Sequence, residues 1–327
     1  MWKVLAFLQQ RLVIAIPVML VLGFVFGVQV DAGPLQFLVL PFTFLMVYPM
    51  MVNLRLQELT HLSDLRLQGV TQAINFLIIP FLAFGLGLWF FPEQPWLALG
   101  LLLAGLVPTS GMTISWTGMA GGNVPAAIRM TVVGLLLGAL ATPFYVDVLM
   151  GATLEVDLLR ILWQIGVIVL LPLALGQLTR LLLIRRVGPG GFREQWAPRF
   201  PLLSTLGVLG IVFIAMALNA EALLAAPEML LWILVPLILL YLATFALSTL
   251  VGRLLFARGD AIALVYGTVM RNLSIALAVA MNAFGTEGAA AALVIALGFV
   301  IQVQAAAWYV RLSNAVFGPP EPRDPAT

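Results

Sequence analysis

Long apolar runs dominate this 327-residue chain and restrict the folds open to it. A helix needs about 20 apolar residues to cross the hydrocarbon core of a bilayer, and runs of that length follow one another along the sequence. Only 9% of the residues are charged, whereas a soluble domain has about 25%. The sequence therefore predicts an all-α polytopic membrane protein in contact with lipid, and its small basic excess does not require a nucleic-acid partner.

Hydropathy and helix-breaking residues divide the chain into ten expected transmembrane helices. Turn-forming sequences such as Asp31-Ala32-Gly33-Pro34 separate them. Met1 to Gln10 lacks a cleavage site after a short apolar core, so we interpret it as mature sequence. The expected spans are residues 11–29, 34–52, 70–91, 95–119, 123–149, 158–184, 200–223, 227–256, 259–284 and 287–315.

The distribution of charge supports this division. With a cytoplasmic N-terminus and alternating spans, Arg160 is the one basic residue outside, and Arg129 and Arg271 fall within spans. The other thirteen of the 16 basic residues lie on the cytoplasmic side, as the positive-inside rule predicts. We therefore expect a multi-pass inner-membrane protein with both termini in the cytoplasm, and we expect Arg129 to reach the headgroups.

A weak internal repeat relates the two halves of the chain. Met50-Met51-Val52-Asn53 resembles Met216-Ala217-Leu218-Asn219, and the spans of each half have similar lengths. Five spans per half is an odd number, so the halves must run in opposite directions, as in the inverted five-helix repeats of many secondary transporters. The expected halves are residues 1–157 and 158–327.

The fourth span changes character after Pro108. Proline should kink or break the helix there, and Thr109, Ser110, Thr113 and Ser115 follow at once. A helix that starts inside the membrane offers free N–H groups to an anion or a polar ligand. These four residues are therefore predicted to bind substrate, and the alternative is that their hydroxyls only bond to their own helix.

The ninth span carries Arg271, followed by Asn272 and Ser274. Arg271 lies about 18 Å into the span, where insertion costs at least ~2.5 kcal/mol. No carboxylate in the sequence is placed to pair with it. Arg271, Asn272 and Ser274 are therefore predicted to bind substrate, with an Arg held by carbonyls of the broken fourth span as the alternative for Arg271.

Other polar residues of the spans form a supporting set, for which bonding between helices is the main alternative. This set consists of Asn53, Gln72, Asn75, Thr131 and Asn219, with Gln164, Asn282, Gln302 and Gln304 ranked below them. The chain has no cysteine, its one histidine (His61) is expected in a loop, and it contains no phosphate-binding loop motif. We expect no catalytic residue, no resident metal and no cofactor.

Four segments resemble the arsenite efflux permeases and, more distantly, the bile acid:sodium symporters. They are Met46–Met51 with Glu58-Leu59, Asn75–Pro80, Gly105–Asn123 and Ala276–Gly285. The resemblance implies that unwound fourth and ninth helices cross near the midplane. It also implies a permease for a small anion or polar solute, which includes arsenic-resistance-type efflux.

The chain departs from both families at their functional positions. Arsenite permeases have a cysteine at the position of Thr109 and a glutamate near Ser274, and with no cysteine this chain cannot bind arsenite through a thiolate.

In the symporters a serine–asparagine pair binds sodium, and this pair falls on Thr113 and Ile114. The glutamate and glutamine of the symporters' ninth span fall on Gly267 and Arg271. Thr131 keeps a family threonine. Most oxygen ligands that sodium would need are thus absent, and our hypothesis is that the Arg271 guanidinium occupies the space of the coupling cation.

A sodium-coupled organic-anion symporter stays open as an alternative, and a non-transporting sensor or scaffold is a weaker one. Substrate, direction, coupling ion and oligomeric state stay open.

Overall fold

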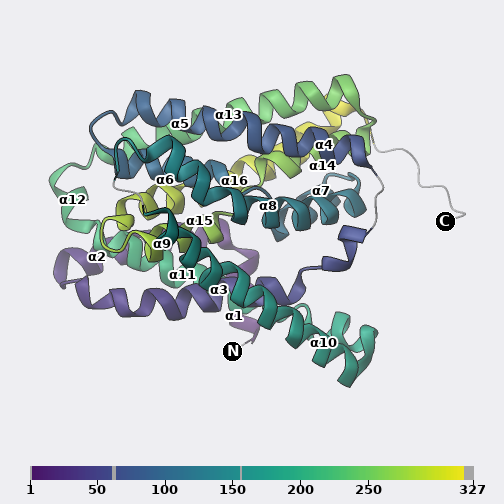
Figure 1. Ribbon diagram of the computed structural model, residues 1–327, viewed down its shortest axis with the longest axis horizontal. Helices are drawn as coiled ribbons and strands as arrows, with labels where there is room; N and C mark the ends of the chain where they lie inside the picture. Colours follow the sequence, from purple (N-terminus) through teal and green to yellow (C-terminus); the bar gives the residue numbers. More distant parts are fainter. Residues whose placement is uncertain (1, 61–63, 155–156, 320–327) are drawn as a thin grey trace, which may run out of the picture.

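A computed structural model describes residues 2–60, 64–154 and 157–319 of the protein (Figure 1). All regular elements in this part of the chain are helices, and a single isolated β-bridge joins two of the segments between them. Seven helical stretches are long and apolar enough to cross a bilayer, and three shorter apolar helices accompany them. The predicted all-helical, multi-pass class is therefore confirmed. His61 lies outside the described residues.

The helices of the first half follow the expected apolar runs closely. Proline stands in the first turn of α6 and α8, where its missing N–H costs nothing. In order, the elements are α1 (Trp2–Gln10), α2 (Leu12–Gln29), η1 (Gly33–Leu38), α3 (Val39–Asn53), η2 (Leu56–Thr60), α4 (Leu65–Ala73), η3 (Ile74–Ile78), α5 (Ile79–Phe90), α6 (Pro95–Leu106), α7 (Gly111–Met119) and α8 (Val124–Met150).

The second half is built in the same way, with a sharp kink near the end of α10. Gly188 has φ +76° there, which turns the chain before η5. The elements are α9 (Leu158–Ile165), η4 (Gly166–Leu170), α10 (Leu171–Gly191), η5 (Phe192–Trp196), α11 (Phe200–Leu218), α12 (Ala220–Ala225), α13 (Met229–Leu255), α14 (Arg258–Val269), α15 (Leu273–Ala283) and α16 (Gly288–Phe317).

The helices form two groups, which we call the first and the second group. In the first group α11 packs against α2 and α3, and α3 also packs against α10. In the second group α5 packs on α6, α6 and α15 pack on α16, α13 packs on α14, and α8 contacts α6, α7 and α14. Figure 1 shows α2, α3 and α11 along one side of the molecule and α5, α13 and α14 along the other.

Helices α6, α15 and α16 lie at the centre. Residues Leu97–Leu106 of α6 are all buried, as are nearly all residues of α15. Helices that are apolar on every side belong in such a position. The two interrupted helices, α6–α7 and α14–α15, thus bring their breaks into the interior.

Candidate functional site

The fourth predicted span consists of two helices, as the Pro108 signal predicts. α6 ends at Leu106, Val107 is extended and Thr109 has φ +61°, a conformation uncommon for a β-branched residue. The Thr109 hydroxyl donates to the Pro108 carbonyl at 2.7 Å. Ser110 then caps α7, since its Oγ accepts from the Met112 N–H at 3.3 Å and its own N–H donates to Thr113 Oγ1 at 3.1 Å. The polar cluster therefore ends one helix and starts the next.

The ninth predicted span is interrupted in a similar way. α14 ends at Val269, Met270 is extended, and α15 starts at Leu273. The side-chain oxygen of Asn272 caps α15 by accepting from the Ile275 N–H at 3.2 Å. Two helix N-termini, each with a partial positive charge, therefore lie in the interior.

The two breaks pair through their backbones. Pro108 and Arg271 form the antiparallel β-bridge, and the Asn272 N–H donates to the Val107 carbonyl at 2.8 Å. Backbone groups freed by a break inside lipid must find partners within the protein, and this pairing satisfies the Asn272 N–H and the Val107 carbonyl. We call this place the crossing point.

Gln302, in the middle of α16, also holds the crossing point. Its Oε1 accepts from the Arg271 N–H at 2.8 Å and from the Tyr241 hydroxyl at 2.9 Å, and its Nε2 donates to the Arg271 carbonyl at 3.2 Å. The sequence ranks Gln302 among minor polar residues, because nothing in it shows which backbone groups the side chain will reach. Its one signal is an amide in an apolar helix, which it shares with Gln304.

The guanidinium of Arg271 is enclosed by oxygen atoms. Nη1 donates to Asn75 Oδ1 at 2.6 Å and to the Thr268 carbonyl at 3.0 Å, and Nη2 donates to the Gly105 carbonyl. Nε is buried without a partner, and the residue is 3% exposed. One of these partners, the Gly105 carbonyl, belongs to the fourth span, as in the alternative interpretation of Arg271, while the other two come from the third and ninth expected spans. Among the described residues no carboxylate forms an ion pair with it.

A cavity of about 300 Å³ lies beside the crossing point, and we call it the crossing-point cavity. The first group contributes Met50 and Asn53 from α3 and Ser204 and Thr205 from α11 to its walls. The second group contributes Ser110, Ile114, Ser115, Thr131, Leu135, Arg271, Asn272, Leu273, Ser274, Phe299 and Gln302. The cavity therefore lies between the two groups, with mostly apolar walls and a few polar groups.

Five of the seven predicted binding residues line this cavity: Ser110, Ser115, Arg271, Asn272 and Ser274. The Ser115 hydroxyl donates to the Gly111 carbonyl of its own helix at 3.4 Å. This contact is the kind that the alternative interpretation of the fourth-span hydroxyls describes.

The other two predicted binding residues, Thr109 and Thr113, are fully buried and lie outside the cavity wall. Their hydroxyls form the turn and cap described above, so their contacts in this structure are internal.

The supporting residues divide between the cavity and the helix contacts. Asn53 and Thr131 line the cavity. Asn75 holds Arg271 and donates to the Gly267 carbonyl at 3.0 Å, and Asn219 bonds the Ala215 and Ala289 carbonyls at 2.7 and 2.8 Å. Gln72 is outside the cavity wall, and its amide is buried without a partner. Within the described ranges no three His, Asp or Glu residues come together as metal ligands.

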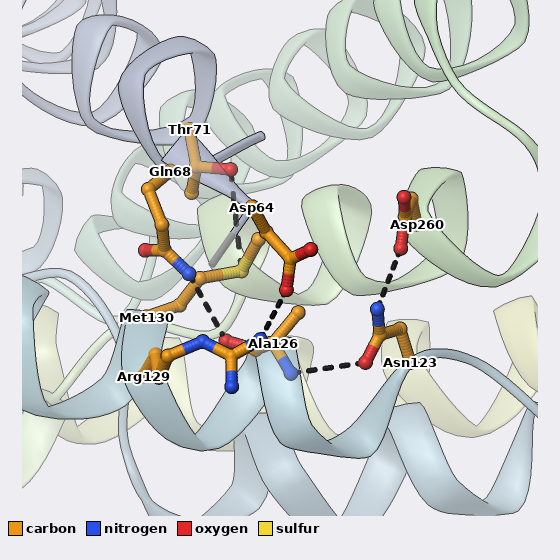
Figure 2. A network of polar contacts seen from close by, with 8 residues as sticks. All are labelled: Asp64, Gln68, Thr71, Asn123, Ala126, Arg129, Met130 and Asp260. Atoms are coloured by element: carbon orange, nitrogen blue, oxygen red, sulfur yellow. Dashed lines mark hydrogen bonds and ion pairs between the residues drawn. The ribbon is translucent and has the colours of Figure 1, made fainter. Parts of the chain in front are cut away.

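Arg129 makes an ion pair with Asp64. The sequence instead predicts that its side chain reaches toward the headgroups. Figure 2 shows this pair beside the Gln68 amide, which donates to the Ala126 carbonyl at 3.3 Å. In the same view the Asn123 amide donates to Asp260 at 2.7 Å. The pair and its neighbours join the start of α4 to the first turns of α8 and to α14. The sequence-based interpretation missed Asp64 because the partners are far apart along the chain.

Comparison with known proteins gives a family match and several relatives. The model of the sodium bile acid symporter family matches residues 40–226. The arsenical-resistance protein Acr3 of Corynebacterium glutamicum is 24% identical, over 75% of this chain and 70% of its own. The Acr3 of Alkaliphilus metalliredigens is 26% identical, over 83% of this chain and 79% of its own. YbaS of Bacillus subtilis is 26% identical, over 73% and 76% of the two chains.

Proposed function

The chain belongs to the sodium bile acid symporter family, a family of secondary transporters and not of enzymes, and from this membership we propose that it moves a small anion or polar solute through the crossing-point cavity. The observation that carries the proposal is the position of the cavity. It lies between two groups of helices and against two helix breaks. Rocking of one group against the other would expose the cavity alternately to the two sides.

We further propose ten transmembrane helices in two inverted five-helix repeats, residues 1–157 and 158–327. One interrupted helix in each half, α6–α7 and α14–α15, supports this division. The breaks also explain why two of the ten expected spans fall short of spanning length, since they leave the short apolar helices Pro95–Leu106 and Leu273–Ala283. The third short apolar helix, Ile14–Gln29, corresponds to the first expected span. The excess of arginine on one side supports an inner-membrane location with both termini in the cytoplasm.

The chemistry of the cavity favours a negative or strongly polar substrate. The N-termini of α7 and α15 and the uncompensated charge of Arg271 make the local potential positive. Ser110, Asn272 and Ser274 offer hydroxyl and amide groups beside these helix starts. The mostly apolar walls would accept the body of a small organic solute.

Efflux of the arsenic-resistance type is one specific form of this function. Two relatives carry the name arsenical-resistance protein, and this chain has no cysteine. Arsenic would therefore have to be bound as an oxyacid, through hydroxyl and amide groups.

We also propose that transport needs no sodium, because the Arg271 guanidinium takes the place of a coupling cation. Three oxygen atoms, from Asn75, Thr268 and Gly105, surround it, and oxygen ligands of this kind are those that a hard cation would use. A sodium-coupled organic-anion symporter is the alternative.

The test measures uptake into proteoliposomes of arsenite, arsenate and taurocholate with sodium or choline in the buffer. We expect the unmodified protein to transport at least one probe equally well in both buffers. R271Q should lose most of this activity and regain part of it with sodium, while R160Q, which changes an exposed arginine away from the cavity, should behave as the unmodified protein. Sodium-stimulated uptake by the unmodified protein would favour the symporter alternative.

A further inference from the structure

A second cavity, of about 490 Å³, adjoins the crossing-point cavity. Three arginines line it: Arg55, two residues after the end of α3, Arg180 in α10, and Arg193 in η5. We call it the arginine vestibule. The kink at Gly188, whose φ of +76° is readily adopted only by glycine, folds η5 back toward α10. Figure 1 shows this end of α10 extending away from the other helices.

The charges of the vestibule are unbalanced. Glu58 is the one carboxylate among its described lining residues. In the part of the chain that the structure describes, none of the three guanidinium groups has a carboxylate within ion-pair distance. Arg55 and Arg180 are close enough for their positive charges to repel each other. An anion between them would remove this repulsion.

The guanidinium of Arg180 is already restrained before any anion binds. Arg180 lies over the ring of Phe192, 5.1 Å from the ring centre, and such a contact restrains the side chain while leaving its N–H groups available. An arginine fork that is already positioned binds phosphate, sulfate or carboxylate oxygens with less loss of entropy.

The vestibule continues into the crossing-point cavity. Asn53, Leu54, Ile114 and Thr131 line both. At this shared wall the Asn53 amide donates to the Ala197 carbonyl at 2.8 Å, while its oxygen is buried without a partner. The shared wall therefore has an unused acceptor for a hydroxyl group of a bound molecule.

We propose that the arginine vestibule is a binding site for the anionic group of a small molecule, and that anions load from it into the crossing-point cavity. The binding rests on the arginines alone. The loading step rests on the proposed transport function. The same chemistry would also hold the phosphate of a lipid headgroup, so the test includes both sources.

The binding test follows the thermal unfolding of the purified full-length protein in a neutral detergent. Potassium phosphate is compared with potassium chloride at equal ionic strength. We expect phosphate to raise the unfolding temperature of the unmodified protein, because a ligand that binds only the folded form stabilises it. R55Q, R180Q and R193Q should each bind phosphate about tenfold more weakly. R186Q removes an exposed arginine of α10 that does not line the vestibule and should respond as the unmodified protein.

Nanodiscs of phosphatidylcholine, with and without phosphatidylglycerol, separate the two sources. If anionic lipid abolishes the phosphate response, the vestibule holds a headgroup and the loading step is wrong. An absent phosphate response in both nanodiscs, or equal losses in R186Q and R180Q, would overturn the site itself.

The loading step has its own readout in proteoliposomes. R180Q should raise the KM for a transported anion about tenfold and leave the maximal rate nearly unchanged. An unchanged KM would overturn loading through the vestibule. Phosphate binding without transport of any probe would leave the site standing and would contradict the proposed function alone.

Discussion

At the scale of single residues, the buried polar groups of this protein act mainly on backbone. Arg271 places its charge among carbonyl oxygens of Thr268 and Gly105 and on Asn75. Gln302 bonds both the N–H and the carbonyl of Arg271. A helix break in lipid is stable only when such groups find partners, so these side chains complete the break as capping residues complete an ordinary helix end.

Gln302 allows a direct test of this role. Q302L should lower the free energy of unfolding by about 1–3 kcal/mol, because the Arg271 N–H and the Tyr241 hydroxyl would lose their acceptor while staying buried. The measurement is thermal or denaturant unfolding in detergent.

Gln304 provides the matched control, since it lies two residues away on α16 and is exposed. Q304L should leave stability unchanged. Equal effects of the two substitutions would show that Gln302 does not hold the break.

At the scale of elements, the α6–α7 break depends on glycines in the neighbouring helix α8. α8 passes the α6–α7 break with Gly134 and Gly138. A Cβ on Gly134 would lie 2.7 Å from Thr109 Oγ1, and one on Gly138 would lie 2.7 Å from Pro108 Cδ and 3.3 Å from Val107 Cα. The second contact involves backbone and a proline ring, which cannot move aside.

G138A should therefore destabilise the protein by about 1–3 kcal/mol, the usual cost of overpacking, and should reduce transport because the extended segment would shift. Unfolding and uptake are measured together. G85A is the matched control on α5, where a Cβ would meet nothing within 4 Å. It should be neutral or stabilising by up to about 1 kcal/mol from helix propensity. A neutral G138A would contradict the close packing.

Much of this element level could be predicted from the sequence. Apolar runs and turn residues give the helix bounds, and Pro108 with its hydroxyl cluster gives the first break. The partners of the breaks could not be predicted, because contacts such as Gln302 with Arg271 or Asp64 with Arg129 join residues far apart in the chain. The roles of Thr109 and Thr113 could not be predicted either, because a hydroxyl that caps a helix and one that binds a ligand cannot be distinguished in the sequence.

At the scale of the whole molecule, the proposed rocking requires the two groups to separate at defined contacts. One such contact is the hydrogen bond from the Asn282 amide on α15 to Thr43 Oγ1 on α3, at 3.0 Å. The absence of cysteine makes the chain a clean background for crosslinking.

The double variant T43C/N282C should lose transport on oxidation and recover it with a reductant, because the disulfide would join the groups. S248C/T268C is the control. Its hydroxyls are 2.6 Å apart across α13 and α14, within the second group, so its disulfide should leave uptake unaffected. The extent of crosslinking in both double variants is measured by labelling the remaining free thiols. Transport by fully crosslinked T43C/N282C would contradict the relative motion.

The anchored guanidinium of Arg271 has an electrical consequence. In the proposed rocking motion, a fixed positive charge travels with the second group and moves through part of the membrane voltage, which is worth about 2.3 kcal/mol for a full unit charge at 100 mV. A monovalent anion beside it would cancel that charge, so the conformational change of the loaded transporter would depend little on the membrane voltage. The voltage would then act mainly on the empty transporter and determine the rate of its return.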